Sequence, residues 1–451
     1  MHKHYFLILI LLTFISCGTV TSGNTQEEAD TNQDNNEVLQ EVSITCKESV
    51  TTKSFQKAYS PQSIQIETPN RLTLLLAETP TFKETLFDNQ GLYKLFQTEY
   101  FWADETEKNL DVSTYTDPQK LIDDLKYKED RWSFAVTPEL YNNAVSQKSV
   151  GFGFSCQDIK TGCLITYVRI DSPADKMDLR RGDIIQKIDN QTATQELIYA
   201  KGQEEKRLNF ELSRPNSNEL CSGKVLPREY TYKVVKSKTV NTSKNEKVGY
   251  LRLDSFLGDD KILAQIDNSF NNFKKNSIEK LVIDLRYNGG GSVNLASKLL
   301  DKLVINKQNQ TQFTLAWNEA YKSQNQIYTF DFSSNALDLK QILFLTTQGS
   351  ASASELIISA MKPYLPEENV VIIGDKTHGK PVGMSGQYDG NYYYFLINFV
   401  VKNSLGFYDY FDGLAVTSGC SITDDPFHEM GDPKESMLKS ALQYIDTGSC
   451  Q

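Results

Sequence analysis

The chain has 451 residues, of which 39% are hydrophobic, 11% aromatic and 23% charged. This composition supplies enough apolar side chains for packed cores and excludes a wholly disordered chain, and the length suits about three domains. The 25 glycines and 13 prolines are too few for a collagen-like or proline-rich protein. The net charge of −11, without a long run of Lys or Arg, does not favour nucleic acid as a partner.

The first residues have the features of an export signal. Lys3 precedes an apolar run over residues 5–15, which is too short to cross a bilayer but suits the apolar part of a secretory signal. The run ends in Phe14-Ile15-Ser16-Cys17-Gly18, which resembles the lipobox of bacterial lipoprotein signal peptides. The resemblance implies cleavage before Cys17 and lipidation of its thiol. An ordinary signal peptide, cut nearby, is the alternative.

Residues 18–45 are predicted to form an acidic tether, because they are rich in Asp, Glu, Asn, Gln and Thr and poor in large apolar side chains. No later segment of the sequence is long and apolar enough to span a membrane. We therefore expect a bacterial cell-envelope protein that is held to a membrane by a lipid on Cys17. Its body would lie in the periplasm or on the cell surface.

Seven cysteines are present, and none forms a Cys-x-x-Cys pair, so we expect no metal site. Without Cys17, six remain, an even number that permits disulfides in an exported chain. Cys156 and Cys163 could close a hairpin, and Cys420 and Cys450 could staple the C-terminus. Free buried thiols are the equally weighted alternative.

Residues 46–147 are predicted to form a small helical domain without visible chemistry. Residues 92–101 carry apolar side chains at helical spacing, and Asp117-Pro118 predicts a second helix start. Strands such as residues 71–77 would precede these helices.

Residues 148–240 carry a sharper pattern. Glycines bracket the segment Gly151, Phe152, Gly153, Phe154, and further on come Ser172-Pro173-Ala174 and the turn Arg181-Gly182-Asp183 before an apolar strand at residues 184–188. This pattern resembles a PDZ domain. The resemblance implies that Gly151, Phe152, Gly153 and Phe154 form a peptide-binding loop, whose amides hold a C-terminal carboxylate while the peptide adds as a strand. The alternative is that the two glycines merely allow a tight turn.

Residues 241–451 alternate apolar strands with helical segments, which predicts a largely parallel sheet with helical crossovers. The expected strands are residues 248–253, 280–285, 341–346 and 370–374, and the expected helices are residues 262–273, 353–363 and 433–445. The predicted fold class is therefore a multidomain α/β protein with a small helical domain, a PDZ-like β domain and an α/β core.

Two turns of this core could carry chemistry. Asp284-Leu285-Arg286-Tyr287-Asn288-Gly289-Gly290-Gly291-Ser292 follows a strand, and its bare glycine amides could hold an oxyanion. The sequence lacks the endings typical of nucleotide-binding loops. Gly349-Ser350-Ala351-Ser352-Ala353-Ser354-Glu355 joins a strand to a helix, where a nucleophile elbow would place its serine. Simple helix capping by Ser352 or Ser354 is the alternative.

A third segment, Gly374-Asp375-Lys376-Thr377-His378-Gly379-Lys380-Pro381, holds a lysine between glycine and proline. Together with residues 130–133, 248–256, 284–291, 349–355 and 411–414, it resembles the C-terminal processing peptidases, a Ser–Lys protease family. The resemblance implies that Ser352 is the nucleophile, Lys380 the general base, and Gly290 and Ala353 the oxyanion amides, with Gly289 as the fallback. Met384 stands where the family often has a Gln that orients the lysine.

The alternative base is His378, which could share a strand face with Lys380 in a Ser–His–Asp arrangement. A lysine base must be neutral near pH 7, which requires its pKa to fall by about 3 units, or about 4 kcal/mol. Burial against apolar walls can supply that change.

The sequence therefore predicts a serine endopeptidase of the cell envelope that cleaves unfolded proteins or C-terminal peptide tails without metal or cofactor. Its partners would be peptide substrates and, through the lipid, a membrane, but not nucleic acid. A catalytically inactive peptide-binding lipoprotein on the same fold is the main rival. A self-hydrolysing or acyl-transfer enzyme on the same Ser–Lys pair is a further one.

Overall fold

The computed structural model describes residues 44–48, 88–204, 206–214, 219–258 and 260–450, together with the backbone of residues 76–77. The export signal, Cys17, most of the acidic tether and residues 71–75 lie outside these ranges. None of the helices in the described ranges is long and apolar enough to cross a membrane.

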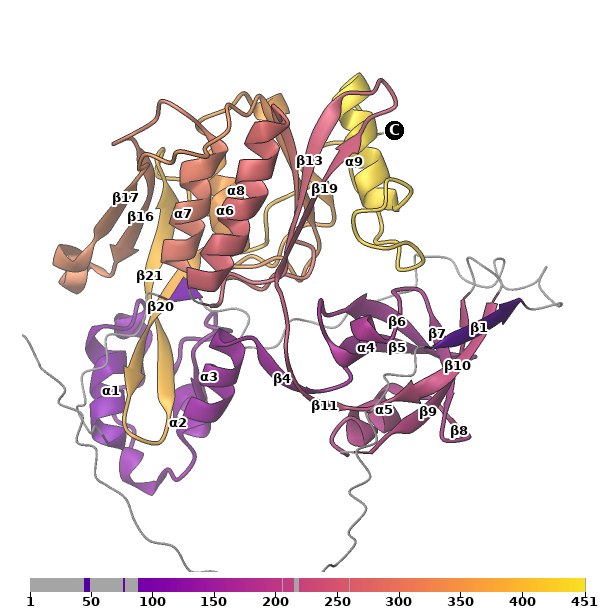
Figure 1. Cartoon of the computed structure of the whole chain (residues 1–451). Helices are drawn as coiled ribbons and strands as arrows, with labels where there is room; N and C mark the ends of the chain where they lie inside the picture. Colours follow the sequence, from indigo (N-terminus) through magenta and orange to yellow (C-terminus); the bar gives the residue numbers. More distant parts are fainter. Residues whose placement is uncertain are drawn as a thin grey trace, which may run out of the picture. The chain divides into compact units, whose positions relative to one another are not determined.

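A five-stranded sheet forms the centre of the C-terminal half (Figure 1). Its order is β12-β13-β14-β18-β19, with β13, β14, β18 and β19 parallel and β12 antiparallel at one edge. The strands are β12 (Val235–Asn241), β13 (Lys247–Leu253), β14 (Lys280–Asp284), β18 (Gln341–Thr346) and β19 (Val370–Gly374). The predicted parallel sheet is confirmed.

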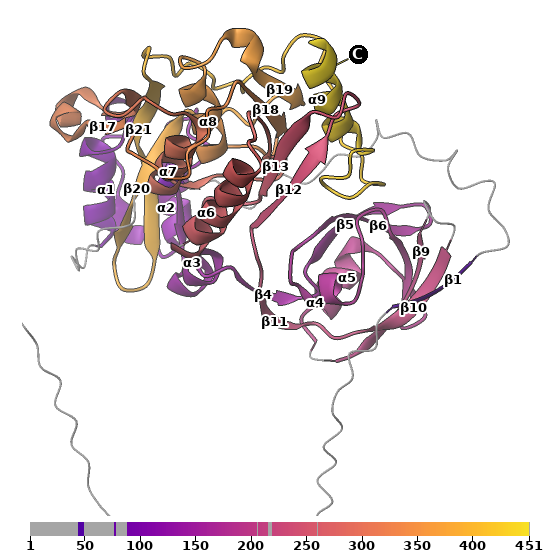
Figure 2. The same ribbon diagram turned by 45° about the horizontal axis from the view of Figure 1, so that its top comes forward.

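Helices cover both faces of this sheet. Successive side chains of β13 point to opposite faces and are apolar on both, so both faces must be covered. Leu251 and Leu253 face a core shared with α6 (Asp260–Lys275), α7 (Val293–Leu303) and α8 (Ala353–Met361). Val248 and Tyr250 face a second core under α9 (Ser436–Thr447). Figure 2 shows α6, α7 and α8 on one side and α9 on the other. The last helix begins at Ser436, not at residue 433 as expected, because Glu435 caps it by accepting from the amides of Met437 and Leu438.

A second sheet of seven strands, which the sequence analysis did not predict, lies beside the first. Its order is β15-β2-β20-β21-β16-β17, and β3 also pairs with β21. The strands are β2 (Leu76–Ala77), β3 (Phe134–Val136), β15 (Gly291–Ser292), β16 (Thr311–Trp317), β17 (Gln326–Thr329), β20 (Val382–Tyr388) and β21 (Tyr393–Asn403). Almost every residue of β21 is buried, so its sequence lacks the polar–apolar alternation that marks a half-exposed strand.

The predicted N-terminal helices form and pack on this second sheet. They are α1 (Asn89–Thr98), α2 (Pro118–Leu125) and α3 (Pro138–Val145), with 3-10 turns at Ala103–Glu105 and Val112–Thr114. Asp117 caps α2 by accepting from the amides of Gln119 and Lys120. Phe96 and Leu121 share one core with Phe395 of β21. This packing attaches the helices to the sheet whose strand β20 follows Lys380.

A third sheet has the order β1-β10-β9-β7-β6-β5, with β8 paired to β7. We call it, with the β4–β11 ribbon and its helices, the small β unit. Its elements are β1 (Thr45–Glu48), β4 (Lys148–Gly151), β5 (Phe154–Ile159), β6 (Gly162–Val168), α4 (Pro173–Lys176), β7 (Ile184–Ile188), β8 (Gln191–Thr192), α5 (Gln195–Lys201), β9 (Leu208–Arg214), β10 (Glu219–Val225) and β11 (Arg228–Thr231).

Within the described residues, three disulfides cross-link the chain. Cys156–Cys163 closes the β5–β6 hairpin and Cys420–Cys450 fixes the C-terminus, as the sequence analysis considered. The third, Cys46–Cys221, joins β1 to β10 across 175 positions of sequence. The free-thiol alternative does not hold for these six cysteines.

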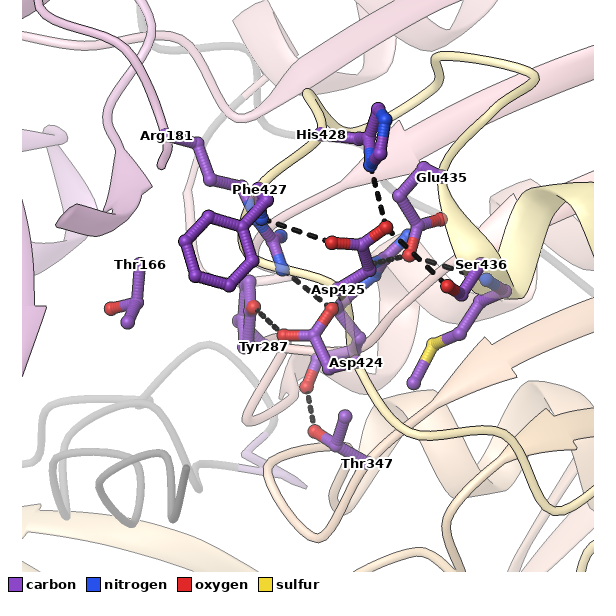
Figure 3. Close-up of polar contacts among 12 residues, drawn as sticks. Thr166, Arg181, Tyr287, Thr347, Asp424, Asp425, Phe427, His428, Glu435 and Ser436 are labelled. Atoms are coloured by element: carbon purple, nitrogen blue, oxygen red, sulfur yellow. Dashed lines mark hydrogen bonds and ion pairs between the residues drawn. The ribbon is translucent and has the colours of Figure 1, made fainter. Parts of the chain in front are cut away.

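A buried charge network joins the small β unit to the core (Figure 3). Arg181 pairs with Asp424 at 2.5 Å, and Asp424 also accepts from Arg286 at 2.6 Å and from the hydroxyl of Tyr287. Burial alone would raise the pKa of Asp424, but the two arginines lower it to about 2. Arg286 and Tyr287 belong to the turn that leads into the three glycines, so this network anchors that turn.

Candidate active site

The serine turn has the backbone of a nucleophile elbow. Ser352 lies between β18 and α8 with φ 60° and ψ −112°, a conformation that non-glycine residues rarely adopt. Its Oγ is buried and, among the described residues, has no hydrogen-bond partner. The amide of Ala353, the first residue of α8, belongs to the first turn of the helix, where amides have no acceptor within the helix. A strained serine at a helix N-terminus, with bare amides beside it, is the arrangement that acyl transfer uses.

Glu355 brings the serine and the lysine segments together. One carboxylate oxygen of this buried side chain accepts from the amides of both Ser352, at 2.8 Å, and Lys380, at 2.9 Å. The other oxygen accepts from the amide of Gly379 and the hydroxyl of Thr377, both at 2.6 Å. The backbone amides of the predicted nucleophile and of the predicted base therefore bind the same carboxylate. The sequence analysis gave Glu355 no role beyond its place in the serine turn.

Lys380 has the electrostatic property that a lysine base needs. Its side chain is fully buried, and burial lowers its pKa to about 7, against the opposing influence of Asp130 and Glu355. Lys380 can therefore lose its proton near neutral pH, as a general base must.

The connection between α2 and β3 contributes residues to this site to which the sequence analysis gave no role. Asp130 accepts from the hydroxyls of Tyr100 and Ser133 and from the amide of Trp132. The indole of Trp132 donates to Nε2 of His378 at 3.3 Å. The sequence signal that could have found these residues is the resemblance of residues 130–133, which include Trp132, to a segment of the family.

This contact also bears on His378 as an alternative base. Its Nε2 already accepts from Trp132, and its backbone amide donates to the carbonyl of Ser350. Burial, Arg131 and Lys380 all lower the pKa of His378. The histidine therefore holds the Thr377–Lys380 loop against the serine turn, and its Nε2 is not presented to Ser352.

The glycine turn lies directly against the serine. A Cβ placed on Gly290 would come within 2.7 Å of the Cβ of Ser352, so only glycine fits there. Asn288 organises this turn: its Oδ1 accepts from the amide of Gly290 at 2.9 Å, and its carbonyl accepts from the amide of Ala351. The Gly290 amide already donates to Asn288. This favours the amide of Gly289 over that of Gly290 as the second oxyanion donor beside Ala353. The oxyanion assignment stays a prediction.

The remaining predicted site residues lie in the small β unit. Gly151 and Gly153 both have positive φ, and a Cβ on Gly153 would lie 2.2 Å from the Cβ of Ser172. The carbonyls of Phe152 and Gly153 accept from the amides of Ala174 and Arg169. Cys17 lies outside the described residues. Among the described residues, the side chains of Cys46, Glu219 and Cys221 lie close enough together to suggest metal ligands. The two cysteines form a disulfide, however, so their sulfurs are not thiolate ligands.

Comparisons with known proteins bear on the family and the fold of this chain. Residues 247–389 match the family model of peptidase family S41, and residues 88–134 match the S41 N-terminal domain. The chain therefore carries the domains of the S41 peptidases, the C-terminal processing peptidases, and the resemblance seen in the sequence is confirmed.

Curated relatives include CtpA-like serine proteases of Staphylococcus. The protein of Staphylococcus aureus strain N315 is 25% identical over 298 residues, which cover 65% of this chain and 56% of that protein. That of Staphylococcus haemolyticus is 23% identical over 299 residues, which cover 64% of this chain and 55% of that protein. The chain thus spans little more than half the length of these relatives. A solved S41 protease from Bacteroides fragilis has a TM-score of 0.68 at 21% identity, and the match covers 80% of this chain and 98% of that one, which shows the shared fold.

Proposed function

We propose that the protein is a serine endopeptidase that uses a Ser352–Lys380 dyad. The observation that carries this proposal is the shared contact with Glu355, which holds a strained serine beside a buried lysine whose pKa is about 7. Neutral Lys380 takes the proton of Ser352 Oγ as that oxygen attacks the peptide carbonyl. The amides of Ala353 and of Gly289 or Gly290 hold the oxyanion.

The lysine ammonium then gives its proton to the leaving amine, and the peptide C–N bond breaks to leave an acyl ester on Ser352. In the second half of the reaction, neutral Lys380 takes a proton from water as that water attacks the ester. Release of the carboxylic product returns the proton to Ser352. Each half needs one proton carrier, and Lys380 suffices for both.

The direct test is to incubate the purified protein with an unfolded protein, beside a Ser352→Ala variant. We expect fragments from the first and an intact substrate from the second. The rival function is a catalytically inactive peptide-binding scaffold, which Met384 favours because it replaces the glutamine that often orients the lysine. Equal lack of cleavage by both proteins, with peptide still bound, would establish the scaffold instead.

The activity should depend on pH through Lys380. Because the base must be neutral, kcat/KM for a peptide is expected to rise about tenfold per pH unit below pH 7 and to level off above it. A pH profile measured with a substrate that does not titrate between about pH 5 and 9 checks this. A profile that continues to rise toward about pH 10 would mean that the lysine keeps its ordinary pKa and would remove the basis of the dyad.

For substrate delivery, we propose that the small β unit acts as a PDZ domain. β5 is an end strand of its sheet, so its outer edge can accept a peptide strand, and α5 packs beside it. The loop from Gly151 to Phe154 leads into β5, and the carbonyls of Phe152 and Gly153 accept from the amides of Ala174 and Arg169. Gly151 and Phe154 already pair with Arg228 and Val168 in strand ladders. The amides of Phe152 and Gly153, between those ladders, would hold the C-terminal carboxylate.

Amidation of the substrate C-terminus should then weaken docking about tenfold or more, because capture of a carboxylate by amides is charge-assisted. We expect slower cleavage of a long amidated substrate and unchanged cleavage of a short peptide that reaches Ser352 directly. Titration of free and amidated peptides against the Ser352→Ala protein measures the docking step alone. Equal binding of the two peptides would exclude carboxylate capture.

We further propose that the protein is tethered to a membrane of the bacterial cell envelope by a lipid on Cys17. The sequence around Cys17 supports this, as does the acidic segment after it. A Cys17→Ser variant is expected to leave the membrane fraction while retaining cleavage activity. A variant that stays with the membrane would show that another element anchors the chain.

A further inference from the structure

The two residues assigned to chemistry are closed off from solvent. Ser352 and Lys380 both have 0% of their surface exposed. A peptide bond must approach Oγ of Ser352 to be cleaved, so part of the chain has to yield before a substrate can enter. The strands that pair beside the glycine turn and after Lys380 point to one such part.

Strand β2 lies between the two strands that continue the active-site segments. It pairs in parallel with β15 through Leu76 opposite Gly291 and Ala77 opposite Ser292. On its other side Ala77 pairs in parallel with Met384 of β20. Gly291 adjoins Gly290, which touches Ser352, and β20 begins two residues after Lys380. An extended piece of this chain therefore runs between the nucleophile side and the base side of the site.

The other side of β15 is already occupied. Phe256 forms a bridge with Gly291, donates its amide to the carbonyl of Gly290 at 2.8 Å and accepts from the amide of Ser292 at 2.9 Å. An incoming extended peptide that pairs with β15 next to Ser352 must therefore take the side that β2 holds. Peptides commonly bind to sheets by adding a strand in this way.

Within the described residues, β2 pairs with its neighbours over a short length. Two residue pairs join β2 to β15 and one joins it to β20, whereas seven pairs join β20 to β21. Strands with so few pairs open at a small fraction of the global unfolding free energy. The rest of the sheet, β20-β21-β16-β17, is continuous without β2. Departure of β2 would thus free the edges of β15 and β20 without breaking the fold.

We propose that strand β2 (Leu76–Ala77) is an internal competitor of the substrate: it occupies the position of the substrate strand between β15 and β20 and must leave before cleavage. This rests on the proposed endopeptidase function. The substrate is then an extended peptide that pairs through its backbone with β15 and β20. Occupancy by β2 lowers the apparent affinity for that peptide in proportion to the fraction of molecules that are open.

A double variant, Leu76→Pro and Ala77→Pro, tests this, because proline lacks the amide that a strand ladder needs. A Leu76→Val and Ala77→Ser variant keeps both amides and is the matched control. With a short peptide substrate, we expect the proline variant to show a KM about tenfold lower than wild type with kcat unchanged. The control variant should match wild type, and thermal unfolding should confirm that both are folded. A proline variant with unchanged or higher KM would overturn the proposal.

Peptide binding separates this proposal from the proposed function. A labelled peptide with the sequence of residues 71–80 is titrated against Ser352→Ala protein with intact β2 and with the proline pair. We expect tighter binding to the latter, and competition with an unrelated extended substrate peptide. Tighter binding without any cleavage by the Ser352-containing protein would refute the enzyme but keep the competitor. Equal binding to both proteins would refute the competitor even if the enzyme cleaves.

Discussion

Replacing Lys380 with Met is expected to abolish peptide cleavage and to raise the melting temperature of the protein. The loss in kcat/KM should reach about 10²- to 10⁴-fold, the usual contribution of a general base. The gain in stability follows from burial, which lowers the pKa of Lys380 from the ordinary lysine value of 10.5 to about 7 on folding. Between these pH values the unfolded chain binds a proton that the folded chain has lost, so folding becomes more favourable as pH rises. Methionine removes this cost, of the order of 4 kcal/mol near pH 7.

The matched variant is His378→Ala, which removes the other candidate base from the same loop. We expect this variant to keep most of the activity. It should lose some stability, because removal of the imidazole ring removes the hydrogen bond from Trp132. Peptide cleavage and thermal unfolding at neutral pH are the two measurements. An active Lys380→Met protein together with an inactive His378→Ala protein would reverse the assignment of the base.

Replacing Glu355 with Gln is the second substitution with a large expected effect. Both carboxylate oxygens accept two hydrogen bonds, so either orientation of the amide turns an NH₂ group toward two donors. The clash separates the serine turn from the lysine loop. A displacement of about 1 Å between reacting groups can cost about 10²-fold in rate, so we expect kcat to fall by about that factor with KM little changed.

The control for this prediction is Glu319→Gln, an exposed glutamate in an exposed ion pair with Lys322, which should leave kcat and stability unchanged. Separate kcat and KM values for a short peptide test the positioning role. A Glu355→Gln protein that keeps wild-type kcat would show that the shared carboxylate does not position the dyad. Loss of the folded state in this variant alone would be visible as a lower melting temperature, and kcat is then measured below it.

Much of the core could be predicted because its signals are local. The apolar runs at β13, β14, β18 and β19 are short, bounded by turns and alternate with helical segments, so a largely parallel sheet could be predicted, although not the order of its strands. The second sheet was missed because β21 is buried on both faces and its partners β3 and β16 come from distant parts of the sequence. No periodicity in a single segment specifies such pairings.

By itself, the sequence determined which residues could carry chemistry: Ser352 on a strand-to-helix turn, three bare glycines after a strand and Lys380 between glycine and proline. Side-chain type and local turn geometry are enough for that, because each motif is a short continuous segment. Only the tertiary structure decided how these residues act. The pKa of Lys380 depends on burial by elements from across the chain, and Glu355 joins two loops only once β18 and β19 are paired. The place of β2 beside the active-site strands likewise depends on pairing between segments that are far apart in the sequence, which no local pattern encodes.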